Sequence, residues 1–147
     1  MIDPLTMRIM SGVIIFRSGG PISWASILQE RTSRSSSEAE IKATSELTKR
    51  ILALKNVMGD IHLHDAHKCT RDWNDNRNCV DWACGIIPKA VCHVNIRDAY
   101  VRSSVWDCEI QVKHIIGKLN PADLFTKEIR DNLHFRTLRD LVVQASS

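Results

Sequence analysis

Three acidic residues stand where a folded chain could gather them into one site. Glu40 lies in the first turn of a predicted helix, Asp75 directly follows a predicted strand, and Asp123 begins the helix after the last predicted strand. Carboxylate oxygens are the ligands that Mg²⁺ and Mn²⁺ prefer. If the side chains converge, two such ions about 4 Å apart can activate a water and stabilise the leaving oxygen of a phosphodiester. Taken singly, each acid also fits a structural role at a helix start or in a turn.

The composition is that of an ordinary globular protein. The chain has 147 residues, of which 44% are hydrophobic and 25% are charged, and these values exclude a disordered or collagen-like chain. This length predicts a single domain over residues 1–147. A net charge of +3 permits contact with a polyanion but does not require it.

The sequence also predicts the cellular compartment. Its apolar runs are far shorter than the roughly 18 residues that a membrane span needs, and the N-terminus has no signal-peptide pattern. The five cysteines are an odd number without a CxxC pair, which favours free thiols in a reducing compartment. We therefore expect an intracellular protein, cytoplasmic or nuclear, that is not secreted and does not contact a membrane.

The hydrophobic pattern predicts alternating strands and helices that would position the three acids. The clearest signals are the amphipathic run from Ala39 to Leu54 and the strict polar–apolar alternation from Glu109 to Ile115. The predicted elements are a β-hairpin at 11–28, a long helix at 36–58, a strand and a short helix within 68–84, a helix at 94–106, a strand at 109–115 and C-terminal helices within 121–143. This order predicts an α/β or α+β layered domain.

Several motifs, taken in their order along the chain, resemble one known family. They are SGVIIFRSGGPISWAS and SRSSSEAEIKA, then DNRNCVDW, and finally HIIGKLNPADLFTKEIRDNLHFRTLRDL. Together they resemble the ribonuclease H region at the end of the polyprotein of copia-type LTR retrotransposons, over nearly the whole chain. The resemblance implies an α/β fold, a ribonuclease H-like mixed sheet flanked by helices. It also implies an enzyme that uses two Mg²⁺ or Mn²⁺ ions to cut the RNA of an RNA–DNA hybrid during reverse transcription. The reverse transcriptase and integrase regions of the same polyprotein are the implied partners.

The resemblance assigns roles to four residues. Glu40, the second Glu of SSSEAE, corresponds to the family's helix acid, and Asp75 and Asp123 correspond to its next and last metal-binding acids. His114 lies nine residues before Asp123 and resembles the flexible histidine that assists proton transfer or product release. A strand-end histidine bonded to backbone is the alternative for His114.

The chain departs from the family in its opening strand. The family's first acid lies on a central strand that precedes the segment resembling residues 8–12, and Asp3 is too close to Ser11 to be that acid. We therefore expect this first strand to be missing, with one metal ligand lost and neighbouring strands left with unpaired edges. We therefore expect this chain to be a fragment or decayed copy of the domain, with weak or no activity.

The strand that leads to Asp75 is also unusual. Arg71 and Asp72 occupy positions where the resemblance expects core residues. A further negative charge beside a metal site is tolerable only in contact with water. These substitutions, like the missing strand, favour a fragment or decayed copy.

Two other functions remain open. His62, His64 and His67 have the H-x-H-x-x-H spacing of zinc-binding hydrolases, although Asp65 and Ala66 reverse the order of that motif, and a solvated loop is the favoured alternative. The second function is non-catalytic nucleic-acid binding, in which basic side chains contact phosphates and tryptophans stack on bases. The favoured alternative is that the basic side chains are simply solvated and that the tryptophans lie in the core. The tryptophans are Trp24, Trp73, Trp82 and Trp106.

Overall fold

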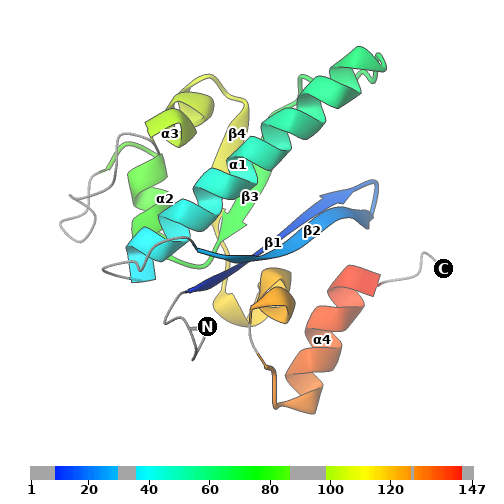
Figure 1. The fold of residues 1–147 in the computed structure, drawn as a ribbon, viewed down its shortest axis with the longest axis vertical. Coiled ribbons are helices and arrows are strands. Elements are labelled where there is room, and N and C mark those ends of the chain that lie inside the picture. Colours follow the sequence, from blue (N-terminus) through cyan, green and yellow to red (C-terminus); the bar gives the residue numbers. More distant parts are fainter. Residues whose placement is uncertain (1–8, 30–35, 87–98, 127, 144–147) are drawn as a thin grey trace. The chain divides into compact units, whose positions relative to one another are not determined.

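The computed structural model describes residues 9–29, 36–86, 99–126 and 128–143. The chain divides into two compact units, residues 1–34 with 115–147 and residues 35–114, and each is described by itself. Both contain helices and short strands, so the fold is mixed α/β (Figure 1). None of the described helices combines the length and hydrophobicity that crossing a bilayer requires.

The first unit begins with the predicted hairpin. Strands β1 (Met10–Arg17) and β2 (Gly20–Leu28) pair antiparallel. The two residues between them, Ser18 and Gly19, both have positive φ angles, as the tight turn of a two-residue hairpin requires. The predicted 11–28 hairpin is therefore confirmed.

A short 3-10 helix, η4 (Pro121–Phe125), packs on this hairpin. The Asn120 side chain caps it by accepting a hydrogen bond from the Ala122 N–H at 3.1 Å, and Pro121 occupies the first position. Ser26 Oγ on β2 donates to the Phe125 carbonyl at 2.7 Å. The tighter 3-10 geometry corrects the expected regular helix at Pro121, but Asp123 remains in its first turn.

Gly12 on β1 allows η4 to approach the strand. A Cβ built on Gly12 would lie 2.3 Å from the Ala122 carbonyl oxygen and 2.8 Å from Thr126 Cγ2. The remaining elements of this unit are η3 (Gly117–Leu119) and the helix α4 (Asn132–Val143), whose Leu138 is fully buried. This α4 is the last of the C-terminal helices expected within 121–143.

The second unit consists of helices around a parallel pair of strands. Its elements are α1 (Ser36–Asp60), β3 (Thr70–Asn74), α2 (Arg77–Ala83), α3 (Ala99–Trp106) and β4 (Ile110–His114). The strands pair from Thr70 opposite Ile110 to Asn74 opposite His114. The long helix, the strand and helix within 68–84, and the strand at 109–115 are confirmed within two residues at each end. For the helix expected at 94–106, residues 94–98 lie outside the described part.

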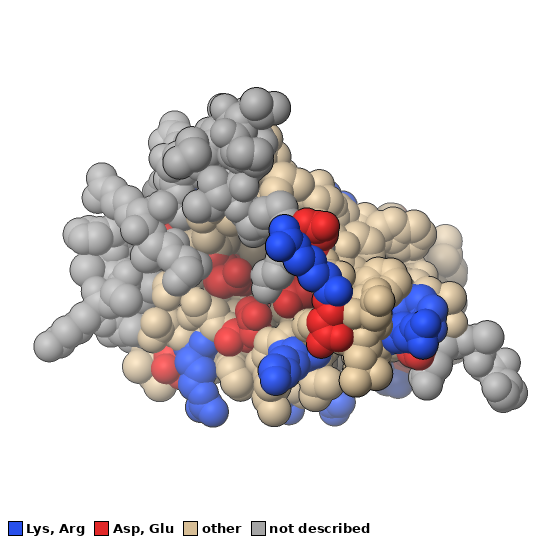
Figure 2. Space-filling view, turned by 90° about the horizontal axis from the view of Figure 1, so that it is seen from below, with Lys and Arg blue, Asp and Glu red and all other residues tan. Residues whose placement is uncertain are grey.

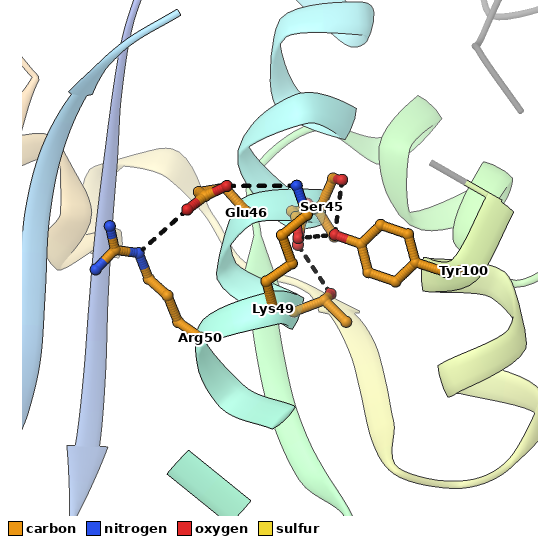
Figure 3. Close-up of polar contacts among 7 residues, drawn as sticks. Ser45, Glu46, Lys49, Arg50 and Tyr100 are labelled. Carbon is orange, nitrogen blue, oxygen red and sulfur yellow. Dashed lines mark hydrogen bonds and ion pairs between the residues drawn. The ribbon is translucent and has the colours of Figure 1, made fainter. Parts of the chain in front are cut away.

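Helix α1 organises this unit through an apolar and a polar set of contacts. Its fully buried Ile41 belongs to a core that also includes Val101 of α3 and Ile110 of β4. Tyr100 of α3 reaches α1, where its hydroxyl lies 2.8 Å from Ser45 Oγ and also donates to the Ser45 carbonyl (Figure 3). Lys49 Nζ lies 5.8 Å from the centre of the Tyr100 ring, at a distance suited to a cation–π contact.

The described strands form two sheets of two strands each, ordered β1-β2 and β3-β4. One sheet is antiparallel and the other is parallel. The single mixed sheet and the single domain that the resemblance implies therefore remain predictions.

We predict that Gly12→Ala destabilises the protein by about 1–3 kcal/mol, because the added methyl group forces β1 and η4 apart. Gly20→Ala is the matched control, since a Cβ there meets nothing within 4 Å. Urea unfolding of both variants measures the difference. Equal stability of Gly12→Ala and the unmodified chain would contradict the close packing of η4 on β1.

Candidate acidic site

Asp75 and His114 lie at the same end of the parallel strand pair. Asn74, the last residue of β3, pairs with His114, the last residue of β4, and Asp75 follows immediately. The carboxyl ends of parallel strands share one edge of a sheet, where functional groups often gather. The unit therefore brings together two of the predicted site residues that are far apart in sequence.

Helix α1 places Glu40 near the same strand end. Asn74 Nδ2 donates a hydrogen bond to Thr44 Oγ1 at 3.0 Å, and Thr44 Oγ1 lies 3.3 Å from Cys79 Sγ on α2. Glu40 lies one helical turn before Thr44 on the same face of α1. The Asn74–Thr44 bond thus fixes the part of the helix that carries Glu40.

The pKa of the buried Cys79 thiol is affected by three nearby carboxylates. Burial raises its pKa to about 12, the hydrogen bond from Thr44 lowers it, and the charges of Asp72, Glu40 and Asp75 raise it further. Three carboxylates from α1, β3 and the turn after β3 therefore act on one sulfur atom. Without a metal ion, a thiol with this pKa stays protonated near neutral pH, so Cys79 does not serve as a thiolate nucleophile there.

Asp72 is a buried carboxylate in this unit. Its side chain is only 2% exposed. The alternation along β3 explains this burial: Asp72 and Asn74 point inward, while Arg71 and Trp73 point outward. Burial first, and the charge of Glu40 second, raise the pKa of Asp72 from its usual 3.8 to about 7.

The described residues meet the requirements of a metal site only in part. Oxygen donors suit Mg²⁺ or Mn²⁺, and Asp72 Oδ2 is buried without a hydrogen-bond partner in the described part of the chain. However, no group of three or more His, Cys, Asp or Glu among the described residues could hold a metal ion. An ion here would need two carboxylates and several waters, which is the usual mode for Mg²⁺.

Asp123 belongs to the other compact unit. It is half-buried in the first turn of η4, where its backbone carbonyl accepts a hydrogen bond from Thr126 N at 3.2 Å. Its assignment as the last metal-binding acid therefore remains a prediction.

The histidines of the alternative zinc site lie in the loop between α1 and β3. His62, His64 and His67 are exposed, and within the described ranges they form no metal-binding group. His67 instead lines a cavity of about 400 Å³ beside the last turn of α1. The structure therefore favours the solvated loop.

Sequence reasoning missed Asp72 as a member of the acidic site. It treated the residue only as a departure from the family pattern, at a position where a core residue is expected. A signal for its burial was present in the spacing of the strand. Asp72 and Asn74 are two positions apart, and residues at alternate positions share one face of a strand.

We predict that the stability of the metal-free chain falls as the pH rises. The raised pKa of Asp72 means that the folded state binds its proton more tightly than the unfolded state does. This contribution to stability is fully present below the usual carboxyl pKa of 3.8 and is lost as the pH rises through about 7.

Asp72→Asn should remove this dependence and stabilise the protein above about pH 8, by on the order of 4 kcal/mol at most. Thermal and urea unfolding from about pH 5 to pH 9, with a chelator present, measure the effect. Parallel pH profiles for Asp72→Asn and the unmodified chain would refute it.

Comparisons with known proteins identify one relative. The chain is 31% identical over 133 residues to the retrovirus-related Pol polyprotein from transposon TNT 1-94 of Nicotiana tabacum. The match covers 90% of this chain and about a tenth of that polyprotein's length. No protein-family model matches the chain, and no solved structure matches it. The chain is thus related to one segment of a retrotransposon Pol polyprotein.

Proposed function

We propose that this chain is a ribonuclease H-like domain of a retrotransposon, derived from an enzyme that hydrolyses the RNA strand of an RNA–DNA hybrid. The relationship to a Pol polyprotein supports the retroelement origin. The observation that carries the proposal is the placement of Asp75 and His114 at one end of a parallel strand pair, with Glu40 held beside it through Thr44 and Asn74.

The proposed roles follow from the chemistry of these side chains. Glu40 and Asp75 would hold the divalent ion through their oxygens, and Asp123 would supply a further carboxylate. A bound Mg²⁺ or Mn²⁺ would activate the attacking water and stabilise the leaving oxygen. His114 would move a proton to the leaving group or assist product release, as an imidazole does near neutral pH.

The resemblance expects one more acid on a central opening strand, and the described residues contain only two-stranded sheets. A two-stranded sheet is marginally stable by itself. We therefore propose that the 147-residue chain alone is a weak nuclease and that a preceding polyprotein segment completes its sheet. The reverse transcriptase and integrase regions are the proposed neighbours.

Cleavage of an end-labelled RNA–DNA hybrid in Mg²⁺ or Mn²⁺ tests the activity. We expect slow cleavage by the chain alone and faster cleavage when it is extended by the stretch that precedes the matched region in the tobacco polyprotein. Asp75→Asn should reduce the rate by about 100-fold or more, since even outer partners of a metal site are worth 10–100-fold.

Asp131→Asn is the matched control for this assay. Asp131 is an exposed acid that receives a hydrogen bond from Leu133 N at the start of α4. Its charge lies outside the proposed site, so the variant should retain the cleavage rate. An extended chain that folds and binds the hybrid but leaves it intact would overturn the proposed activity.

Exposed tryptophans favour a second candidate, nucleic-acid binding without cleavage. Trp24, Trp73 and Trp106 are 59%, 50% and 87% exposed, whereas Trp82 is buried. The expectation of core tryptophans is therefore wrong for three of the four. Basic and acidic side chains are interspersed on the face shown in Figure 2. On that face, stacking on indole rings rather than charge alone would have to provide the affinity.

Trp73→Ala tests this second candidate. The loss of a stacking ring should weaken binding of single-stranded RNA by about 1–3 kcal/mol, measured by fluorescence anisotropy at fixed salt. Val57→Ala is the control, because Val57 is an exposed apolar residue without a ring. Equal affinities of Trp73→Ala and the unmodified chain would argue against stacking at this position.

A further inference from the structure

Strand β2 differs from the other described strands in length and in charge. It has nine residues, whereas β1 has eight and β3 and β4 have five each. It is also the one of these four strands that contains no Lys, Arg, Asp or Glu: Arg17 lies in β1, Asp72 in β3 and Lys113 in β4. Charged side chains are a common means by which proteins prevent a strand from pairing with another chain. Strand β2 lacks that protection.

One edge of β2 is open within the described part of the chain. There β2 pairs with β1 alone, and an antiparallel partner satisfies only the backbone groups that point toward it. Among the described residues, no further backbone hydrogen bond reaches residues 22–28. Pro21, which has no N–H, lies beside the hairpin turn, so it leaves the rest of the strand able to pair. Such a row of N–H and C=O groups can accept one more strand.

The side chains beside this edge are apolar and exposed. Ile22, Trp24 and Leu28 are 44%, 59% and 37% exposed, and their even spacing places them on one face of the strand. Tryptophan is among the residues that contribute most to the affinity of protein interfaces. The strand therefore suits a partner strand that is itself uncharged and rich in apolar side chains, and β2 has that composition.

We propose that β2 pairs antiparallel with the β2 strand of a second copy of this chain. Trp24 is the middle residue of Gly20–Leu28, so a two-fold axis beside it places the two Trp24 side chains opposite each other and Ile22 opposite Ser26 of the other copy. A two-fold interface uses the same surface on both copies, and two uncharged strands meet without repulsion between like charges. Pairing converts two hairpins into one four-stranded sheet, which is more stable than a two-stranded one.

The proposal is independent of the ribonuclease function. It uses the edge of β2, whereas the polyprotein segment proposed to complete the sheet would pair at the opposite edge, on β1. One strand pair makes a small interface compared with the roughly 1,200–2,000 Å² of a stable complex. We therefore expect a dissociation constant in the range of about 1–10 µM.

Analytical ultracentrifugation of the 147-residue chain tests the proposal. We expect a species of twice the chain mass of 16.7 kDa that dissociates on dilution. Trp24→Lys should weaken the dimer by about ten-fold or more, because it places two like charges opposite each other. Leu133→Lys is the matched control: Leu133 is a 76% exposed apolar residue of α4 in the same unit, and its replacement should leave the dissociation constant unchanged. Circular dichroism checks that both variants fold.

Hydrogen–deuterium exchange of the unmodified chain tests the pairing without any substitution. The N–H groups of residues 22–28 should exchange more slowly at high than at low protein concentration, because the second strand protects those on the open edge. Residues 133–143 should exchange at the same rate at both concentrations. Dimerisation without protection of residues 22–28, or a dimer that Trp24→Lys leaves intact, would place the interface elsewhere and overturn the proposal. A chain that stays monomeric at about 100 µM, well above the expected dissociation constant, would overturn it too.

Discussion

The hydrogen bond from Asn74 to Thr44 is the constraint on which the candidate site depends. It joins the last residue of β3 to the middle of α1 at 3.0 Å within a buried interior. Because the backbone of Asn74 also pairs with His114 on β4, this one residue links the helix that carries Glu40 to both strands. Breaking the bond would leave a buried amide without its partner, at a cost of about 1–3 kcal/mol.

The interior around this bond is polar where a small α/β unit usually has an apolar core. Thr44, Ser45 and Thr48 are buried on α1, as are Asp72 and Asn74 on β3, and Thr44 is hydrogen-bonded to Asn74. A polar interior is stable only when each group has a partner. Most of these groups are hydrogen-bonded, but Asp72 Oδ2 has no hydrogen-bond partner among the described residues.

The two compact units contribute differently to the proposed chemistry. Residues 35–114 hold Glu40, Asp72, Asp75 and His114, and they fix these groups through strand pairing and side-chain hydrogen bonds. Residues 1–34 and 115–147 hold Asp123 on η4, which lies close against β1 because Gly12 has no side chain. The relationship to a Pol polyprotein segment covers most of the chain, so both units are related to that same segment.

The sequence alone determined the elements with strong local signals. The apolar spacing from Ala39 to Leu54 predicted α1, the turn-forming residues from Ser18 to Pro21 predicted the hairpin, and the alternation from Glu109 predicted β4. Asn120 and Pro121 predicted a helical start at Asp123, although the turn is a 3-10 helix. These signals are readable because helix caps, turn geometry and side-chain periodicity act between residues close in sequence.

Only the tertiary structure decided which side chains are buried. Asp72 is inside and Trp73 is half exposed, the reverse of what residue type predicts. The burial of a strand residue depends on which elements pack against its face, and those elements are distant in sequence. The pairing of Asn74 with His114 and with Thr44 likewise joins residues separated by 40 and 30 positions. Local sequence therefore specified the helices and strands, whereas long-range packing specified the electrostatics of the acidic site.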